Sequence, residues 1–260
     1  MKRFLIKTHW LIANQFGLDP RIFFRSLLGL PRYMRDYYRF RDSYAGELDL
    51  SPCLYDWHEE GGTTKNEYFW QDLLVARMIF ESKPEKHVDI GSRVDGFVAH
   101  VASFREIEVL DVRPMTTQIP GITFKQADLM KPLDNMVGYC DSLSCLHALE
   151  HFGLGRYGDP IDPKGFERGL ANMAGLLRDD GVFYLSVPIG IDRVEFNANR
   201  VFDPRTIIQC AETNALSVRG LSVIQEGGMV RKVSLTEENL RKLAEDRYNL
   251  GILIFKKKIQ

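Results

Sequence analysis

Apolar and polar positions follow two different patterns along the chain, and the change comes near residue 84. From residue 85 onward, short apolar runs alternate with longer segments in which apolar residues recur every three or four positions. The short runs predict buried strands, and the periodic segments predict amphipathic helices. The expected strands are residues 86–92, 106–114, 122–129, 139–149, 182–190, 216–228 and 249–258, and the expected helices are residues 94–104, 162–181 and 203–214. This order predicts an α/β domain over residues 85–260, with a mostly parallel seven-stranded sheet and helices on both faces.

Residues 1–84 are expected to form an N-terminal helical segment. Over residues 1–42 the apolar positions fit short amphipathic helices that break at Pro20 and Pro31. These positions are Phe4, Trp10, Phe23, Phe24, Leu27, Leu28 and Tyr37. Residues 43–66 contain several glycines and are expected to be a loop. A further helix is expected at residues 66–82, with an apolar face of Phe69, Leu73, Ala76, Ile79 and Phe80.

Charge is balanced over the whole chain but not over its first part. The 34 Lys and Arg residues nearly match the 35 Asp and Glu residues, so no overall field favours nucleic acid as a partner. Residues 1–42, in contrast, hold nine Lys and Arg against three Asp. The N-terminal segment is either a cap that packs on the main domain or a basic patch for anionic lipid or a phosphate-bearing substrate.

The apolar runs, the first residues and the cysteines together favour a cytoplasmic protein. No apolar run reaches the length of a membrane span, and the first residues lack the cleavage site of a signal peptide. The cysteines at positions 53, 140, 145 and 210 form no Cys-x-x-Cys pair, which suits a reducing compartment. We expect a cytoplasmic protein, with peripheral contact to an anionic membrane as the alternative that the basic segment allows.

The carboxyl ends of the strands are where ligands of a parallel sheet bind. The first strand ends in "VDIGSRVDG", which lacks the Gly-x-Gly-x-x-Gly motif of dinucleotide-binding folds. Gly91 and Gly96 have the spacing of a P-loop, but Phe97 and Val98 replace its lysine and hydroxyl residue. The second strand ends in Asp111, whose carboxylate can accept two hydrogen bonds from a ribose diol. Asp128, after the third strand, is placed to accept from an adenine amino group.

Taken together, these stretches resemble class I S-adenosylmethionine-dependent methyltransferases. "VDIGS" resembles their first motif, "EVLDVRP" their ribose-binding acid, "QADL" their adenine contact and "CDSLSCLHALEH" their fourth strand. The resemblance implies a Rossmann-like methyltransferase fold with S-adenosyl-L-methionine as the cofactor. The cofactor contacts that it implies are Asp89, Gly91, Ser92, Arg93, Asp111, Val112, Asp128 and Leu129.

A closer resemblance is to a family of this superfamily that occurs in bacteria and nematodes. It is carried by "DIGSRVDGFVAH", "DSLSCLHALEHFGLGRYGDP", "LSVPIG" and "FNANRVFDP", and it runs over about residues 66–225. The bacterial members often lie among surface-polysaccharide genes. This resemblance implies a small hydroxylated acceptor, such as a sugar or sugar-nucleotide of surface-polysaccharide biosynthesis.

The first motif departs from the superfamily pattern at Arg93 and Asp95, where glycines would let the backbone approach the cofactor. Three interpretations remain open. Arg93 points outward while Asp95 and Gly96 supply the turn, Arg93 pairs with the carboxylate of the cofactor, or cofactor binding is weakened or lost.

"HALEH" at residues 147–151 matches the His-x-x-Glu-His pattern of a class of zinc peptidases. Such a site needs a regular helix and a third ligand, whereas "FGLGRYG" follows here and disfavours a helix. We therefore expect no metal. Glu150 and His151 either cap a turn or act on the methyl acceptor, with His151, His147 and Glu150 as the catalytic residues.

Four further residues are expected to bind the acceptor: Tyr157, Asp159, Asn197 and Arg200. Arg200 has the alternative of pairing with Asp203. The sequence thus predicts an O-methyltransferase that acts on a small carbohydrate-type molecule and not on nucleic acid. The alternatives are a non-catalytic scaffold of this fold in polysaccharide assembly, or methyl transfer to a nitrogen or phosphorus-linked acceptor.

Overall fold

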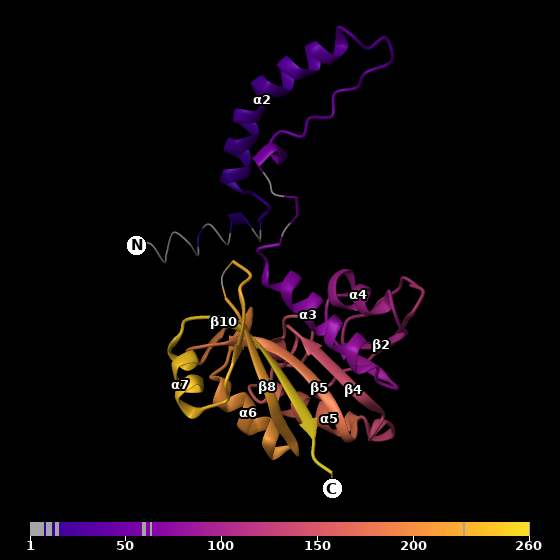
Figure 1. The fold of residues 1–260 in the computed structure, drawn as a ribbon, viewed down its shortest axis with the longest axis vertical. Coiled ribbons are helices and arrows are strands. Elements are labelled where there is room, and N and C mark those ends of the chain that lie inside the picture. The colour runs from indigo at the N-terminus through magenta and orange to yellow at the C-terminus, as the bar shows by residue number, and fades with distance from the viewer. Residues whose placement is uncertain are drawn as a thin grey trace. The chain divides into compact units, whose positions relative to one another are not determined.

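The chain divides into two compact units, Met1–Thr63 and Thr64–Gln260. The computed structural model describes residues 8, 12–13, 16–58, 61–62, 64–225 and 227–259. The expected helix positions Phe4 and Trp10 lie outside the described residues. The larger unit holds the α/β fold that the alternation of strands and helices predicts (Figure 1).

One sheet forms the centre of the larger unit. Its strands are β1 (His87–Ile90), β2 (Ile107–Asp111), β3 (Ile122–Gln126), β4 (Cys140–Leu146), β5 (Leu177–Ile189), β8 (Leu216–Ile224), β9 (Val230–Val233) and β10 (Asn249–Lys257). The spatial order is β3-β2-β1-β4-β5-β10-β8-β9. Strands β1 to β5 pair in parallel, while β10 pairs antiparallel with both β5 and β8. This is the Rossmann-like methyltransferase fold, with eight strands instead of the expected seven.

The additional strand is β9, which pairs antiparallel with β8 at the edge of the sheet. The expected strand over residues 216–228 ends earlier, at Ile224, where the chain turns to form this hairpin. Helix α7 (Glu237–Glu245) and the small hairpin of β6 (Arg193–Glu195) and β7 (Asn199–Val201) are also absent from the expected elements. The strands of the hairpin have three residues each, so their apolar pattern is weak. Helix α7 is short but amphipathic, with Leu240 and Leu243 on its buried side.

Helices cover both faces of the sheet, as the pattern predicts. Val75 and Ile79 of α3 (Glu67–Ser82) and Val101 of α4 (Ala99–Ala102) belong to the core on one face. Leu170 of α5 (Gly165–Leu176) belongs to the core on the other face, together with residues of α6 (Pro204–Thr213) and α7. Burial of the apolar side chains in these two cores is the main source of the stability of such a layered fold.

Helix α3 belongs to the larger unit, whereas the sequence pattern groups it with the N-terminal segment. The expected apolar face is also wrong in part, since Ala76 and Ile79 are buried but Phe69, Leu73 and Phe80 are exposed. Gln71 and Asp72 take their place on the buried side. The Gln71 side chain accepts a hydrogen bond from Ser186 on β5, so a polar contact fixes the rotation of the helix on the sheet.

The helix expected over residues 162–181 is shorter than predicted. It starts at Gly165 and ends at Leu176, and β5 begins at the next residue. Asp162 accepts a hydrogen bond from the Lys164 backbone N–H in the preceding turn. Asp162 therefore shapes the approach to the helix and does not cap its first turn.

In the smaller unit, α2 (Pro20–Arg41) is one continuous helix. Its Asp19 cap and Pro20 match the expected break at Pro20. The break expected at Pro31 is wrong, because Pro31 lies inside the helix. In the described part of the chain, no helix has both the length and the apolar character that a membrane crossing requires.

Candidate active site

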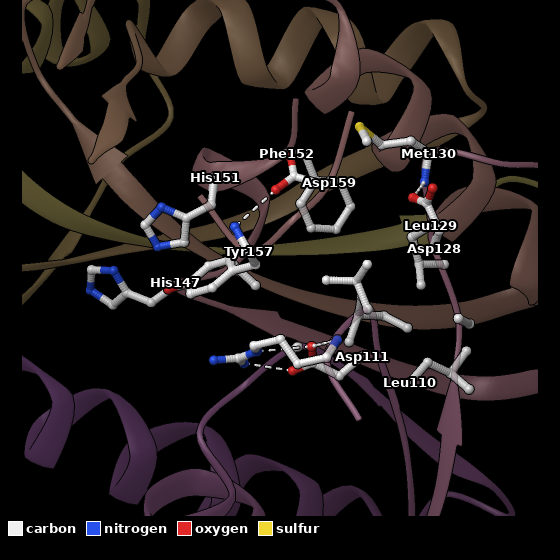
Figure 2. A pocket seen from close by; sticks show the side chains of 16 residues that line it. Leu110, Asp111, Asp128, Leu129, Met130, His147, His151, Phe152, Tyr157 and Asp159 are labelled. Atoms are coloured by element: carbon white, nitrogen blue, oxygen red, sulfur yellow. Dashed lines mark hydrogen bonds and ion pairs between the residues drawn. The ribbon is translucent and has the colours of Figure 1, made fainter. Parts of the chain in front are cut away.

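A cleft of about 1010 Å³ opens at the carboxyl ends of β1, β2 and β4. A smaller apolar hollow adjoins it, since Gly91, Asp111, His147, His151 and Tyr157 line both. Figure 2 shows His147, His151 and Tyr157 on one side of this hollow and Asp128 and Met130 on the other. The fold thus brings the ends of four strands to one place, where ligands of parallel sheets bind.

The loop after β1 is anchored from below by Asp89. This carboxylate is fully buried and accepts hydrogen bonds from the Ser92 backbone N–H (3.0 Å), the Ser92 hydroxyl (2.6 Å) and the Ser144 hydroxyl. The Ser92 hydroxyl in turn accepts from the Leu146 backbone N–H at 3.1 Å. Burial raises the pKa of Asp89 to about 6, although these hydrogen bonds act in the opposite direction. Asp89 does not line the cleft, so it shapes the loop that a ligand would contact.

His87 extends this buried network and was not expected from the sequence. Its Nδ1 lies 2.8 Å from the Ser142 hydroxyl and its Nε2 lies 3.1 Å from the Ser144 hydroxyl. Because Ser144 donates to Asp89, its oxygen is free to accept from Nε2–H, and Nδ1 then accepts from Ser142. Burial lowers the pKa of His87 to about 3, which keeps the ring neutral.

The backbone of the loop turns at Gly91, which has a φ of 68°. A Cβ at this position would lie 3.0 Å from the Cβ of Ala148, so the loop passes close to the end of β4. Further along, a Cβ on Gly96 would lie 2.6 Å from an Asp72 oxygen. Gly91 is the motif glycine that this chain keeps, and Gly96 lets the backbone pass close to Asp72.

Arg93 lies at the rim of the cleft with its guanidinium largely in solvent. Its Nη2 is 2.8 Å from Asp95 Oδ2, and Nε is 3.1 Å from Oδ1. This bidentate pair engages both oxygens of Asp95. The guanidinium also lies 5.4 Å from the centre of the Tyr68 ring, which lines the cleft, and the role of Arg93 toward the cofactor stays a prediction.

Asp111 lies at the end of β2 and lines both the cleft and the hollow. Both of its oxygens contact Arg113, with Nε 3.0 Å from Oδ1 and Nη2 2.6 Å from Oδ2. The same guanidinium lies over the ring of Tyr157, 4.5 Å from its centre. A ribose diol that binds Asp111 therefore has to share this carboxylate with Arg113 or displace the guanidinium.

The hollow beside Asp111 has apolar walls and one carboxylate. Val112 and Leu129 line it together with Ile90, Leu110, Ala127 and Met130. Asp128 lines it as well, and its Oδ1 accepts from the Met130 backbone N–H at 3.0 Å. Apolar walls with an acceptor at one end suit a flat heterocycle that carries an amino group.

His147 and Glu150 form a buried pair at the end of β4. Nδ1 of His147 donates to Glu150 Oε1 at 2.8 Å. Burial lowers the pKa of His147, but the hydrogen bond and the charge of Glu150 outweigh it, so the net shift is upward. The pKa of Glu150 shifts downward, because the hydrogen bond and charge of His147 outweigh the effect of its burial. We therefore describe the pair as imidazolium and carboxylate.

Two atoms of this pair have no hydrogen-bond partner among the described residues, Nε2 of His147 and Oε2 of Glu150. Both residues line the cleft. His147 also has a φ of 54°, a region that costs a residue other than glycine on the order of 1–3 kcal/mol. Unsatisfied polar atoms and backbone strain together are typical of a site that binds a ligand.

His151 lies in the single turn Leu149–His151 that follows β4. Its Nδ1 is 2.7 Å from the carbonyl oxygen of Ala198. A carbonyl only accepts, so Nδ1 carries the proton and Nε2 is the free basic nitrogen. Burial lowers the pKa of His151, and the charge of Arg156 acts in the same direction. The imidazole is therefore neutral near pH 7.

The glycine-rich stretch after His151 folds around Asp159. Its Oδ2 accepts from the backbone N–H groups of Gly153 (2.9 Å) and Gly155 (3.2 Å), and its Oδ1 accepts from that of Tyr157 (3.1 Å). Asp159 therefore uses its carboxylate to hold the loop. Tyr157 lines the cleft, and its ring packs edge-on against His151.

Arg200 and Asn197 lie away from the cleft. Arg200 is buried and donates to the backbone carbonyls of Phe152 (2.6 Å) and Glu150 (3.3 Å), so it fixes the turn that carries His151. It does not pair with Asp203, whose partner is Arg205. Asn197 is exposed, and Asn199 lines the cleft instead.

The zinc interpretation of "HALEH" requires both histidines on a regular helix. Residues 147–151 instead follow the end of β4 and contain one short turn, Leu149–His151. Within the described ranges, no group of three or more His, Cys, Asp or Glu residues has an arrangement that suits a metal ion.

Glu67, Tyr68, Arg156 and Tyr248 are among the residues of the cleft that the motifs did not indicate. Tyr248 donates to Glu67 Oε1 at 2.7 Å, and this oxygen lies 3.5 Å from His147 Nε2. The Tyr68 ring stacks on His147 with centres 4.5 Å apart. Glu67 and Tyr68 begin α3 and Tyr248 precedes β10, so only the fold brings them to the histidines.

Comparisons with solved structures show the same fold. One is a 1,6-didemethyltoxoflavin-N1-methyltransferase from Burkholderia thailandensis with bound S-adenosylhomocysteine. It is 14% identical with a TM-score of 0.52, over 93% of this chain and 92% of its own. A protein from Galdieria sulphuraria described as a sarcosine dimethylglycine methyltransferase is 12% identical with a TM-score of 0.51, over 73% of this chain and 85% of its own. The [4+2]-cyclase SpnF is 11% identical with a TM-score of 0.52, over 73% of this chain and 82% of its own.

Sequence comparisons identify the family of the chain, beyond its fold. No curated protein sequence matches it. Residues 107–257, more than half of the chain, match the model of a family described as "Caenorhabditis protein of unknown function, DUF268". This match agrees with the nematode family that the sequence motifs resemble. The chain therefore belongs to the DUF268 family.

Proposed function

We propose that the chain transfers a methyl group from S-adenosyl-L-methionine to a hydroxyl of a small acceptor. The observation that carries this proposal is the cleft itself, which joins Gly91 and Asp111 of the cofactor side to His151 at the end of β4. The Burkholderia thailandensis structure, which has this fold and binds S-adenosylhomocysteine, supports the choice of cofactor.

The residues of the cleft fit this cofactor. Gly91 lines the cleft and has no side chain, so a ligand can lie beside its backbone. Asp111 offers a carboxylate for the ribose diol, and the apolar hollow with Asp128 suits the adenine ring. When bound, S-adenosylmethionine supplies a methyl group on a positively charged sulfur. The protein then holds the acceptor oxygen in line with the bond between the methyl group and the sulfur. Such positioning lowers the activation barrier by about 7–11 kcal/mol at best.

His151 is placed to act as the general base. The Ala198 carbonyl holds the proton on Nδ1, so the lone pair of Nε2 can take the proton of the acceptor hydroxyl as its oxygen gains the methyl group. Because the lowered pKa keeps this ring neutral, the base is available near pH 7. Such catalysis contributes roughly 10²–10⁴-fold in rate.

The His147–Glu150 pair would orient the acceptor. The unpartnered Nε2 of His147 can donate a hydrogen bond and the unpartnered Oε2 of Glu150 can accept one. A molecule with several hydroxyls satisfies both needs, which supports a carbohydrate-type acceptor. Arg156 lines the cleft without a carboxylate partner in the described part of the chain, which favours an acceptor with a phosphate, such as a sugar-nucleotide. We place this reaction in the cytoplasm, in surface-polysaccharide biosynthesis.

Titration with S-adenosylhomocysteine in a calorimeter tests the cofactor. We expect saturable binding, and folded protein that gives no heat at high micromolar ligand would favour the non-catalytic scaffold. Incubation with S-adenosylmethionine and a panel of sugars and sugar-nucleotides, followed by mass spectrometry, tests the acceptor. Fragmentation of a methylated product distinguishes oxygen from nitrogen or phosphorus-linked acceptors.

The variant His151→Gln tests the base. Turnover should fall by roughly 10²-fold or more. S-adenosylhomocysteine affinity should fall much less, because Asp111 and Asp128, the acceptors proposed for the ribose and the adenine, follow other strands. In the native enzyme, activity should rise with pH, with a midpoint below 6.5, the ordinary pKa of histidine. This rise should be absent from the pH profile of the variant. Unchanged turnover in His151→Gln would leave the histidine with a structural role only.

A further inference from the structure

Helix α2 carries an exposed apolar surface that no described residue of its own unit covers. No residue of this helix is buried. Six large apolar side chains on it are more than half exposed: Phe23, Phe24, Leu27, Leu28, Tyr38 and Phe40. Leu28 is 80% exposed and Phe24 is 63% exposed. Exposed apolar side chains that gather on one element are typical of a surface that binds a partner.

The returning chain of the smaller unit covers a different face of α2. The backbone of Gly29 packs against the Leu54 carbonyl so closely that a Cβ at position 29 would clash with it. The Arg32 guanidinium lies 3.6 Å from the centre of the Trp57 ring. Residues 29, 32 and 33 are accordingly half-buried, and the side chains on the other side of the helix are those of Phe23, Phe24, Leu27, Leu28 and Tyr38.

Arginines border the exposed apolar surface along its length. Phe24 and Leu28 are four residues apart, so their side chains lie one above the other on the helix. A row of arginines lies beside Phe24 and Leu28 on the helix. Arg25 follows Arg21 by four residues, and Arg39 follows Arg25 by fourteen, so all three point to about the same side. All three arginines are exposed, and within the described residues none of them pairs with a carboxylate.

We propose that this face of α2 binds the surface of an anionic lipid bilayer. The phenylalanine and leucine side chains would enter the boundary between headgroups and acyl chains while the helix lies parallel to the surface. The stems of the bordering arginines lie along apolar surface, and their guanidinium groups reach lipid phosphates and carboxylates. A protein partner would need an acidic rim around an apolar groove, whereas every anionic bilayer offers both chemistries together.

The proposal is tested with the full chain and vesicles of two compositions. One contains phosphatidylserine in phosphatidylcholine, and the other contains phosphatidylcholine alone. We expect co-sedimentation with the first and little with the second, and we expect the binding to weaken as salt rises because the arginines contribute through charge. Absence of binding to the anionic vesicles would overturn the proposal, as would equal, salt-insensitive binding to both.

Two variants assign the binding to α2. Leu28→Glu should reduce partition into anionic vesicles by roughly tenfold or more, and Arg21→Gln with Arg25→Gln should do so as well. The control is Val137→Glu, because Val137 lies in the larger unit and is 79% exposed, nearly the same as Leu28. Its binding should equal that of the native chain. Equal loss in the control, or no loss in Leu28→Glu, would overturn the assignment.

A second copy of the chain is the competing occupant of this face. Light scattering of the native protein and of Leu28→Glu decides between the two. A native dimer that Leu28→Glu converts to a monomer would overturn the lipid proposal in favour of self-association. A native protein of the same mass as the variant, together with salt-sensitive vesicle binding, supports the lipid surface.

Discussion

Two buried groups beneath the loop after β1 have pKa values that are shifted in opposite directions. The pKa of Asp89 is raised to about 6 from an ordinary 3.8, and that of His87 is lowered to about 3 from 6.5. Between pH 3.8 and 6 the folded state binds an extra proton at Asp89, so this group loses stabilisation as pH rises. Over the same range the unfolded state binds an extra proton at His87, so that group gains stabilisation as pH rises.

The two contributions oppose each other with slopes of about 1.4 kcal/mol per pH unit each. We predict that Asp89→Asn exposes the slope of His87. Between pH of about 4 and 6, the free energy of unfolding of this variant should rise with pH more steeply than that of the native chain, by about 1.4 kcal/mol per pH unit. Urea unfolding at several pH values measures this difference. The exposed Asp179→Asn serves as the control, and parallel profiles for native chain and Asp89→Asn would contradict the prediction.

Arg113 competes with a ligand for Asp111. In the structure both Asp111 oxygens contact this guanidinium. We predict that Arg113→Ala strengthens S-adenosylhomocysteine binding by up to roughly tenfold, and that Asp111→Ala weakens it by about 1–3 kcal/mol. Calorimetry of both variants measures the effects. Weaker binding in Arg113→Ala would instead make Arg113 a ligand contact.

Sequence spacing locates polar residues at strand ends but does not give the direction of their side chains. Asp111, Asp128, His147 and His151 were expected at the site, and all of them line it. Asp159 and Arg200 were expected to bind the acceptor, but their polar atoms contact loop backbone. Glycine-rich loops leave many N–H and C=O groups without regular partners, and a nearby charged side chain satisfies them.

At the scale of elements, the loop over residues 152–163 depends on Asp159. We predict that Asp159→Ala lowers the free energy of unfolding by about 1–3 kcal/mol, because three backbone N–H groups lose their acceptor. Turnover should fall as well, since Tyr157 and the turn at His151 adjoin this loop, while S-adenosylhomocysteine affinity should change little. Thermal unfolding and calorimetry measure these effects. A fully stable Asp159→Ala would show that the loop holds its shape without the carboxylate.

The strands of the sheet were predictable because each is a short apolar run bounded by polar residues. All seven expected strands are present. The pattern misses β9 and the β6–β7 hairpin, which have few buried side chains. It also misplaces the buried face of α3, because Gln71 and Asp72 are buried through contacts with β5 and with each other. Contacts between segments distant in sequence leave no periodic signal.

At the scale of the molecule, the residues that line the cleft all lie between Glu67 and Tyr248. We predict that a fragment of residues 64–260 binds S-adenosylhomocysteine with the affinity of the full chain but does not sediment with anionic vesicles. Calorimetry and co-sedimentation of the two proteins test this. Loss of cofactor binding by the folded fragment would show that the smaller unit contributes to the site. The sequence pattern placed the boundary at residue 84, and a fragment cut there would lack Glu67, Tyr68 and the whole of α3.

The position of β10 in the sheet has a consequence for protein synthesis. This strand comes last among the elements, yet it pairs with β5 on one side and β8 on the other. Until residue 257 has left the ribosome, β5 and β8 each present an unpaired edge, and the two halves of the sheet cannot join. From the completion of β5 until β10 has been made, the growing chain therefore carries an exposed strand edge, which invites wrong pairing with other nascent chains. Cells that make this protein should therefore depend on chaperones that bind nascent chains. Truncation within β10 should abolish soluble expression, because it removes a central strand of the sheet.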